Sequence, residues 1–247
     1  MTQVIDFLKY IEDTNTAKTA EDIFSHFERA LYRLGFDLVL YSLMTDHATI
    51  GKPAGHGIMR NYSEDWMKYY TEKGYVGVDP VRKQVMLTTH PFLWDRLNSG
   101  GSYSETQKTM MNEAQDAGLR CGIGLGIHCP NREIAGFGFA SSDGTAEINK
   151  NVVSLVKALA SQFHTAYTEH ERRFGQWNTP DRITITELEK QLLYLMMMGK
   201  SNSVISDILN INQHTVDYHV RNLFNTLGAS TRTYAVVKAI RYGLIEP

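Results

Sequence analysis

Aromatic side chains gather between residues 62 and 94, and one carboxylate, Asp79, stands among them in an apolar setting. An indole N–H only donates a hydrogen bond, a phenol donates and accepts, and an ionised carboxylate only accepts. The flat faces of both rings are apolar. Together these groups suit a small ligand that has an amide, a carbonyl and an apolar tail. The aromatic residues are Tyr62, Trp66, Tyr69, Tyr70, Tyr75, Phe92 and Trp94.

Composition alone favours a purely structural interpretation of the same residues. Aromatic side chains on helices mostly fill cores, and an Asp before a Pro mostly forms a turn. Once buried, however, the carboxylate of Asp79 needs a hydrogen-bond donor. We expect the amide of the ligand to supply that donor.

A second set of polar side chains lies on one side of a predicted helix that follows residues 210–212. Asn212 can cap the start of this helix, and Ser201 or Asn202 can cap the start of the helix before it. Each helix has an apolar stripe: Val204, Ile205, Ile208 and Leu209 in the first, and Val216, Val220, Leu223 and Leu227 in the second. The polar side chains opposite the second stripe are His214, Asp217, Tyr218, Arg221 and Asn225.

This pattern fits a helix-turn-helix, whose second helix enters the major groove of DNA and contacts base edges. We expect Arg221 to donate two hydrogen bonds to a guanine, and Lys200 to contact a phosphate. A two-helix hairpin in an ordinary helical bundle is the structural alternative, and the spacing alone favours it.

Further residues in this region carry a resemblance to a known family. From Ile185 to Leu244 the chain resembles the DNA-binding domain of LuxR-type transcription regulators. The matching residues are Thr186, Glu189, Gly199, Lys200, Ser201, Ile205, Leu209, Ile211, Thr215, Val216, His219, Asn222, Leu227, Arg232, Ala235, Ala239, Gly243 and Leu244. The helical spacing and the resemblance together predict a DNA-binding surface formed by Lys200, Ser201, His214, Thr215, Asp217, Tyr218, Arg221, Asn222 and Asn225.

The aromatic stretch resembles the signal-binding domain of the same regulators. The match lies in Tyr62-x-x-x-Trp66-x-x-x-Tyr70, in Val78-Asp79-Pro80-Val81 and in Trp94. In that family the domain binds an N-acyl-homoserine lactone as its signal. The resemblance implies a ligand site formed by Tyr62, Trp66, Tyr70, Asp79, Val81 and Trp94.

Carried over residue by residue, the family's contacts imply a role for each side chain. Trp66 donates its N–H to the lactone carbonyl, Tyr62 donates to the acyl carbonyl, and Asp79 accepts the amide N–H. Trp94 packs on the lactone ring and Tyr70 lines the acyl tail.

Two glycines depart from the family pattern. Gly138 stands where members often have a Ser or Thr that touches the headgroup, so more room or a water molecule is expected near the amide. Gly126 stands where Pro is common.

The charge of the chain divides unevenly along its length. Of 247 residues, 25 are Lys or Arg and 27 are Asp or Glu, so the formal net charge is −2. Residues 183–247 hold six Lys or Arg and five Asp or Glu, a balance of +1, which leaves −3 for residues 1–182. A balance of +1 is a weak electrostatic footprint for DNA binding. We therefore expect a homodimer that places two such segments on a two-fold-symmetric, double-stranded operator.

Apolar periodicity and turn signals predict an α+β domain, a mostly antiparallel sheet flanked by helices, followed by an all-helical domain. The predicted parts are an autoinducer-binding domain at 1–170, a linker at 171–182 and a helix-turn-helix domain at 183–247. The longest predicted helix has more apolar surface than a lone surface helix needs, which also favours pairing with a second copy. Predicted helices span 3–12, 19–34, 63–74, 104–118 and 146–170, with another starting at 80, and predicted strands span 36–44, 56–60, 91–94, 121–128 and 133–142.

Other motifs indicate no cofactor, no metal and no catalytic group. Cys121 and Cys129 are interpreted as buried thiols of a reducing cytosol rather than as a disulfide. Gly122-x-Gly124-x-Gly126 lacks the spacing of a dinucleotide-binding loop and is interpreted as strand glycine. No pair of histidines has the four-residue spacing of a zinc helix, and no Ser/His/Asp or Cys/His arrangement is recognisable from the sequence.

The chain begins without a basic segment followed by a long apolar run, and no stretch approaches the roughly 18 apolar residues of a membrane helix. We therefore expect a cytoplasmic protein with no membrane partner. Its expected function is that of a dimeric, quorum-sensing transcription regulator that responds to an N-acyl-homoserine lactone, with RNA polymerase as a further candidate partner. The alternatives are a regulator that responds to another small molecule or to none, and an enzyme that turns over the pocket ligand.

Overall fold

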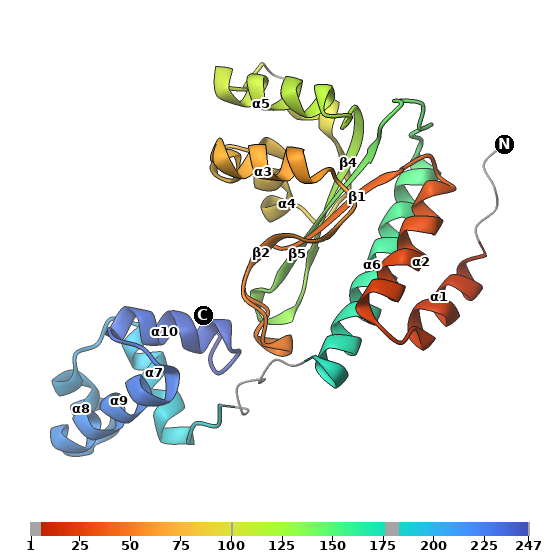
Figure 1. The fold of residues 1–247 in the computed structure, drawn as a ribbon. Helices are drawn as coiled ribbons and strands as arrows, with labels where there is room; N and C mark the ends of the chain where they lie inside the picture. The colour runs from red at the N-terminus through yellow and green to blue at the C-terminus, as the bar shows by residue number, and fades with distance from the viewer. Residues whose placement is uncertain (1–5, 100, 176–182, 247) are drawn as a thin grey trace. The chain divides into compact units, whose positions relative to one another are not determined.

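The computed structural model describes residues 6–99, 101–175 and 183–246. These residues form two compact units, one built on a β-sheet and one all helical (Figure 1). The predicted fold class is therefore confirmed. The start of the first predicted helix and residues 176–182 of the predicted linker lie outside the described residues.

Five antiparallel strands form the sheet, in the order β2-β1-β5-β4-β3. The predicted hairpin is confirmed as the pair β4 and β5, which runs from Cys121 opposite Ser141 to His128 opposite Ile134. The edge strand β3 has only two residues, fewer than predicted. The strands are β1 (Leu38–Leu43), β2 (Gly55–Arg60), β3 (Phe92–Leu93), β4 (Cys121–His128) and β5 (Ile134–Ser141).

Helices cover both faces of the sheet (Figure 1). One face packs against α1 (Phe7–Thr16), α2 (Ala20–Tyr32) and α6 (Lys150–Phe174), with the larger apolar core between them. The other face carries α3 (Glu64–Glu72), α4 (Pro80–Leu87) and α5 (Glu105–Asp116). The aromatic residues that the sequence analysis selects belong to this second layer.

Helix α6 begins and ends four residues later than the predicted range 146–170. The reason for the late start is Asn149, which has extended backbone and caps the helix by accepting from two backbone N–H groups. The apolar surface of α6 is buried within the chain, because it packs on the sheet and on α1 and α2. Phe163, for example, stacks on Phe27 with ring centres 4.6 Å apart. This surface is therefore no argument for pairing with a second copy.

The second unit consists of four helices around an apolar core. The predicted caps are confirmed: Ser201 Oγ accepts from the N–H of Val204 at 3.3 Å, and Asn212 Oδ1 accepts from the N–H of His214 at 2.8 Å. The helices are α7 (Glu187–Met197), α8 (Asn202–Leu209), α9 (Gln213–Leu227) and α10 (Arg232–Arg241).

The two apolar stripes differ in how far they are buried. All four predicted residues of the α9 stripe are buried, from Val216 to Leu227. In α8 only Ile205 is fully buried, whereas Val204 and Ile208 are 41% and 51% exposed. The short α8 therefore packs on the core mainly through Ile205, and much of its predicted apolar stripe is exposed.

The core of the first unit contains a short chain of polar groups. Tyr41 Oη lies 2.9 Å from His164 Nδ1, and Cys129 Sγ lies 3.2 Å from His164 Nε2. Burial, and then the neighbouring His47, lower the pKa of the His164 imidazole to about 4. The imidazole is therefore neutral at pH 7.

Acid should destabilise the first unit through His164. An unfolded histidine takes up a proton near pH 6.5 whereas folded His164 resists it until about pH 4, so the unfolded state binds more protons between these values. The stability present above pH 6.5 is lost as the pH falls toward 4, by up to about 1.4 kcal/mol per pH unit. Urea denaturation at neutral and mildly acidic pH should show a shallower loss in His164→Gln than in the wild type. Equal losses in the two proteins would contradict this assignment.

Candidate functional site

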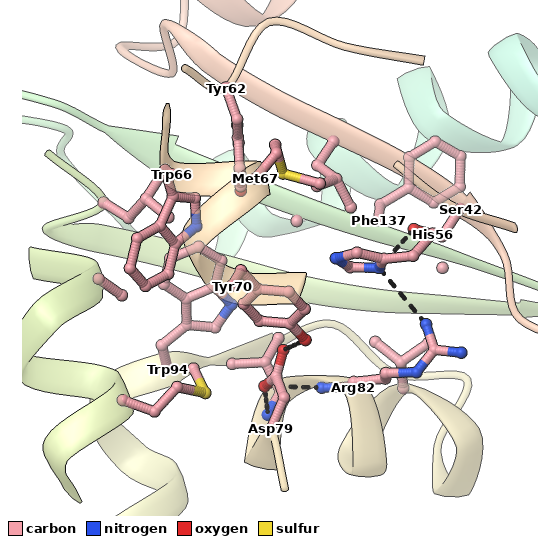
Figure 2. A pocket seen from close by; sticks show the side chains of 18 of the residues that line it. Ser42, His56, Tyr62, Trp66, Met67, Tyr70, Asp79, Arg82, Trp94 and Phe137 are labelled. Carbon is pink, nitrogen blue, oxygen red and sulfur yellow. Dashed lines mark hydrogen bonds between the residues drawn. The ribbon is translucent and has the colours of Figure 1, made fainter. Parts of the chain in front are cut away.

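The six predicted ligand residues line one pocket, between the sheet and the layer of α3, α4 and α5 (Figure 2). The pocket holds about 620 Å³ of space without protein atoms, part of it open to solvent. The mostly apolar lining is typical of small-molecule sites. The structure therefore brings together Tyr62, Trp66, Tyr70, Asp79, Val81 and Trp94.

Glycines of β4 and β5 face the layer that holds this pocket, and Gly136 and Gly138 on β5 line it. A Cβ atom at Gly122 would lie 2.1 Å from the indole of Trp94, and one at Gly124 would lie 2.2 Å from the ring of Phe92. No side chain fits at these distances, so the two rings lie directly on the backbone of β4. The glycine pattern of this segment is strand glycine, as predicted, and it has a steric role in the pocket.

Gly138 on β5 makes room for the hydroxyl of Tyr62. A Cβ atom at Gly138 would lie 2.9 Å from Tyr62 Oη. A Ser or Thr side chain at this position would therefore crowd the Tyr62 hydroxyl. Burial, and then the charge of Asp79, raise the pKa of Tyr62. The phenol stays protonated and can donate to a ligand.

Asp79 is buried and already has three donors within the protein. Its Oδ1 accepts from the backbone N–H of Val81 at 2.7 Å and of Arg82 at 3.2 Å, which caps α4. Its Oδ2 accepts from Tyr70 Oη at 2.8 Å. The expectation that Asp79 depends on the ligand for a donor is therefore wrong. A carboxylate has about four lone-pair sites, so one more donor can still bind.

Burial raises the pKa of Asp79, and the bonds from Tyr70, Arg82 and Val81 oppose that rise. Tyr70 thus holds the carboxylate in place, in addition to lining the pocket. Trp94 differs from both, because its buried Nε1–H contacts no acceptor among the described residues. Such a donor costs about 1–3 kcal/mol, and an acceptor on a bound molecule would remove that cost.

Two of the aromatic residues serve a different purpose. Tyr69 Oη donates to Glu113 Oε1 at 3.1 Å, and Tyr75 Oη donates to Glu113 Oε2 at 2.5 Å. The bond to Glu113 raises the pKa of Tyr75 to about 12. These two phenols connect the α3 region to α5 and do not line the pocket.

Sequence reasoning missed three polar residues that line the pocket, Ser42 on β1, His56 on β2 and Arg82 on α4. Figure 2 shows them at one end of the pocket, with Trp66 and Trp94 at the other. The only local signal was a Ser within an otherwise apolar strand. Their proximity depends on three separate segments and follows no motif.

The predicted base-reading face of α9 is open to solvent. His214, Thr215, Tyr218, Arg221 and Asn225 are exposed, and Asn222 is half-buried. Lys200 and Ser201 are exposed at the start of α8. Arg221 is the one Lys or Arg in the sequence of α9, so it carries the positive charge of this helix.

Asp217 is half-buried and has a partner within its own unit. Its Oδ1 accepts from Asn202 Nδ2 at 2.7 Å, and Asn202 Oδ1 accepts from Arg232 Nη1 at 2.6 Å. Arg232 Nη2 also donates to the carbonyl of Lys200. These bonds join α9 to the starts of α8 and α10. Asp217 therefore positions the helices, a role that the sequence analysis missed.

Two family models match the chain, one in each unit. The autoinducer-binding domain matches residues 19–167, and the domain described as "Bacterial regulatory proteins, luxR family" matches residues 184–239. The chain belongs to the LuxR family of bacterial regulatory proteins. The resemblance inferred from the sequence is thereby confirmed.

Several LuxR-family proteins are similar over most of the chain. The transcriptional activator VanR of Vibrio anguillarum is 30% identical over 195 residues, 76% of this chain and 76% of VanR. The putative HTH-type transcriptional regulator y4qH of Sinorhizobium fredii is 26% identical over 246 residues, 98% of this chain and 74% of y4qH. In fold, the chain resembles Escherichia coli SdiA, with 22% identity, a TM-score of 0.73 and coverage of 98% and 100%.

This LuxR-family member thus combines an autoinducer-binding domain with a DNA-binding helix-turn-helix, the architecture of a transcription regulator. In the part of the chain that the structure describes, no group of three or more His, Cys, Asp or Glu could hold a metal ion. None of the helices described is long and apolar enough to cross a membrane.

The close packing of α4 on β4 should not tolerate a methyl group on the strand. A Cβ atom at Gly126 would lie 2.4 Å from the carbonyl oxygen of Val85, a backbone atom that cannot rotate away. Gly126→Ala should therefore lower the free energy of unfolding by about 1–3 kcal/mol. Gly77→Ala is the matched control, because a Cβ atom there meets nothing within 4 Å, and its effect should stay within about 0.5 kcal/mol. Equal effects in a urea titration would refute the steric role.

Operator binding tests the prediction that Arg221 contacts a base in the major groove of DNA. Arg221→Ala should cost about 1–3 kcal/mol of specific binding and relax the sequence preference at one base pair. Lys200→Ala should weaken binding to all sequences similarly and make the dependence on salt shallower. Titrations of operator and unrelated DNA at several salt concentrations separate the two. An unchanged operator preference in Arg221→Ala would show that Arg221 does not read bases.

Proposed function

We propose that the protein senses an N-acyl-homoserine lactone and, as a homodimer in the cytoplasm, controls target promoters. The observation that carries the proposal is one acceptor, Asp79, and three donors, Tyr62, Trp66 and Trp94, in a single apolar pocket. An N-acyl-homoserine lactone presents the complementary set: one amide N–H, two carbonyl oxygens and an apolar tail.

In this proposal Asp79 accepts the amide N–H as its fourth hydrogen bond. Trp66 donates to the lactone carbonyl and Tyr62 to the acyl carbonyl. Trp94 packs on the lactone ring. Val81 and the face of Tyr70 line the start of the tail.

We propose a dimer because the DNA-binding unit is weakly charged. Residues 183–247 have a balance of +1, and α9 has a single Arg. Two copies double the contacts with phosphate, on which affinity for DNA largely depends. Sedimentation of the complex with operator should give two chains per site. RNA polymerase is a further proposed partner, because relatives such as VanR are transcriptional activators.

A regulator that takes a different signal, or none, is the second candidate. It is favoured by the three internal donors to Asp79, since the carboxylate is satisfied without a ligand. Mass spectrometry of the small molecule that co-purifies from the native host separates the two candidates.

An enzyme acting on the ligand is the least supported alternative. The structure does bring Cys129 within 3.2 Å of His164, a pair that was not recognisable in the sequence. Burial, and then Glu133, raise the pKa of the Cys129 thiol, whereas an activated nucleophile needs a lowered one. Neither residue lines the pocket.

The function is tested at Asp79. Asp79→Asn keeps an oxygen that can cap α4 but removes the charge, so it should weaken binding of an N-acyl-homoserine lactone by about tenfold or more. Because ligand bound to the folded state stabilises it, the rise in melting temperature on adding ligand should shrink in the variant. Asp65→Asn, which changes an exposed carboxylate on α3, is the control and should keep the full rise. If the ligand raises the melting temperature of Asp79→Asn as much as that of the wild type, Asp79 does not bind the ligand and only caps α4.

A further inference from the structure

One end of the pocket is polar although most of the lining is apolar. Ser42, His56 and Arg82 converge there from β1, β2 and α4, opposite the two indoles (Figure 2). His56 stacks on the ring of Tyr70 with ring centres 4.9 Å apart, and the hydroxyl of Tyr70 bonds to Asp79. The polar end of the pocket is therefore separated from Asp79 by the ring of Tyr70. A ligand held by Asp79 and the indoles would direct its tail toward this end.

The hydrogen bonds within this polar end are long. His56 Nδ1 lies 3.3 Å from Ser42 Oγ and 3.4 Å from Arg82 Nη1, and the other contact of Nη1 is the sulfur of Met44 at 3.5 Å. Good N–H···O bonds are shorter, and a thioether sulfur is a weak acceptor. The internal partners therefore use little of the donor capacity of this cluster.

Arg82 also lacks the carboxylate partner that its neighbour has. Arg60 forms an ion pair with Glu64 at 2.8 Å and donates to the carbonyl of Gly57. No ion pair joins Arg82 to a carboxylate among the described residues. The charge of Asp79 is close enough to interact with Arg82, but it forms no ion pair with the guanidinium. The five N–H donors of Arg82 therefore still favour an acceptor of negative character.

His56 is neutral and can donate into the cavity. Burial, and then the charges of Arg82 and Arg60, lower the pKa of its imidazole to about 4. When Nδ1 accepts from Arg82, the proton of the neutral ring resides on Nε2. Figure 2 shows this second nitrogen directed toward the interior of the pocket. Arg82 and His56 therefore offer two donors at the same end.

We propose that this cluster of Ser42, His56 and Arg82 binds an oxygen acceptor, a hydroxyl or a carboxylate, on the tail of the signal molecule. The proposal rests on the lactone-sensing function above and specifies its ligand: an acyl-homoserine lactone with an oxygenated tail rather than a plain alkyl tail. An alkyl tail would offer no acceptor to the remaining N–H donors of Arg82 and His56, which is unfavourable.

The test compares ligands of equal length in direct titrations. The probes are N-acyl-homoserine lactones with alkyl tails of four, six and eight carbons, and the same tails with a terminal hydroxyl or a terminal carboxylate. In the wild type, at least one oxygenated tail should bind about ten- to a hundredfold more tightly than its alkyl counterpart. A carboxylate preferred over a hydroxyl assigns the effect to the charge of Arg82, and the reverse assigns it to the donors of His56 and Ser42.

Variants locate the preference in this cluster. Arg82→Met and, as a second variant, His56→Phe should reduce the affinity ratio of oxygenated to alkyl ligand to about threefold or less. The ratio remains informative even if total affinity falls. Lys83→Met is the matched control, because it removes the same charge from the exposed neighbouring position of α4 and should keep the ratio. Alkyl tails binding as tightly as oxygenated ones at every length, or a full ratio in both Arg82→Met and His56→Phe, would overturn the proposal.

The same data separate this proposal from the proposed function. If no lactone of the series binds, the lactone-sensing function fails. If alkyl lactones bind in a way that depends on Asp79, but oxygen brings no gain, only the assignment of the tail fails.

Discussion

The alternation of side chains along β4 and β5 is the constraint on which the first unit depends. Successive side chains of a strand point to opposite faces. On one face, Ile123, Leu125, Phe137 and Phe139 are buried within the larger core. On the other face, the intervening positions of the paired strands are Gly122, Gly124, Gly126, Gly136, Gly138 and Ala140. The same two strands thus form a dense core on one side and a bare floor on the other, and a register slip of one residue would exchange the two faces.

The bare floor determines how the pocket is built. Because the backbone is uncovered, the rings of Trp94 and Phe92 and the hydroxyl of Tyr62 lie against it. On the other side of the pocket, Asp79 connects two helices, since it caps α4 and accepts a hydrogen bond from Tyr70 of α3. A ligand that bonds to Asp79 would therefore contact the group that sets the start of one helix and the position of another.

The DNA-binding unit is organised by polar caps and a buried core more than by charge. Ser201 and Asn212 satisfy backbone N–H groups at the starts of α8 and α9. The bonds among Asp217, Asn202 and Arg232 hold these helices together. This arrangement leaves the outer face of α9 exposed, with Arg221 as the one Lys or Arg of the helix, and the proposal of a dimer rests on this low charge.

Local sequence determined the type of nearly every element, because caps, periodicity and turns act within a few residues. Ser63, Asp79, Ser104 and Asn212 each begin a helix as predicted. The six ligand residues that the family resemblance implies all lie around one pocket. Tertiary structure alone decided the partners. Tyr69 and Tyr75 bond to Glu113 on a distant helix, and three strand and helix segments bring Ser42, His56 and Arg82 together. The physical reason is that these contacts join residues far apart in the chain, where packing against the sheet, and no local periodicity, sets which side chains meet.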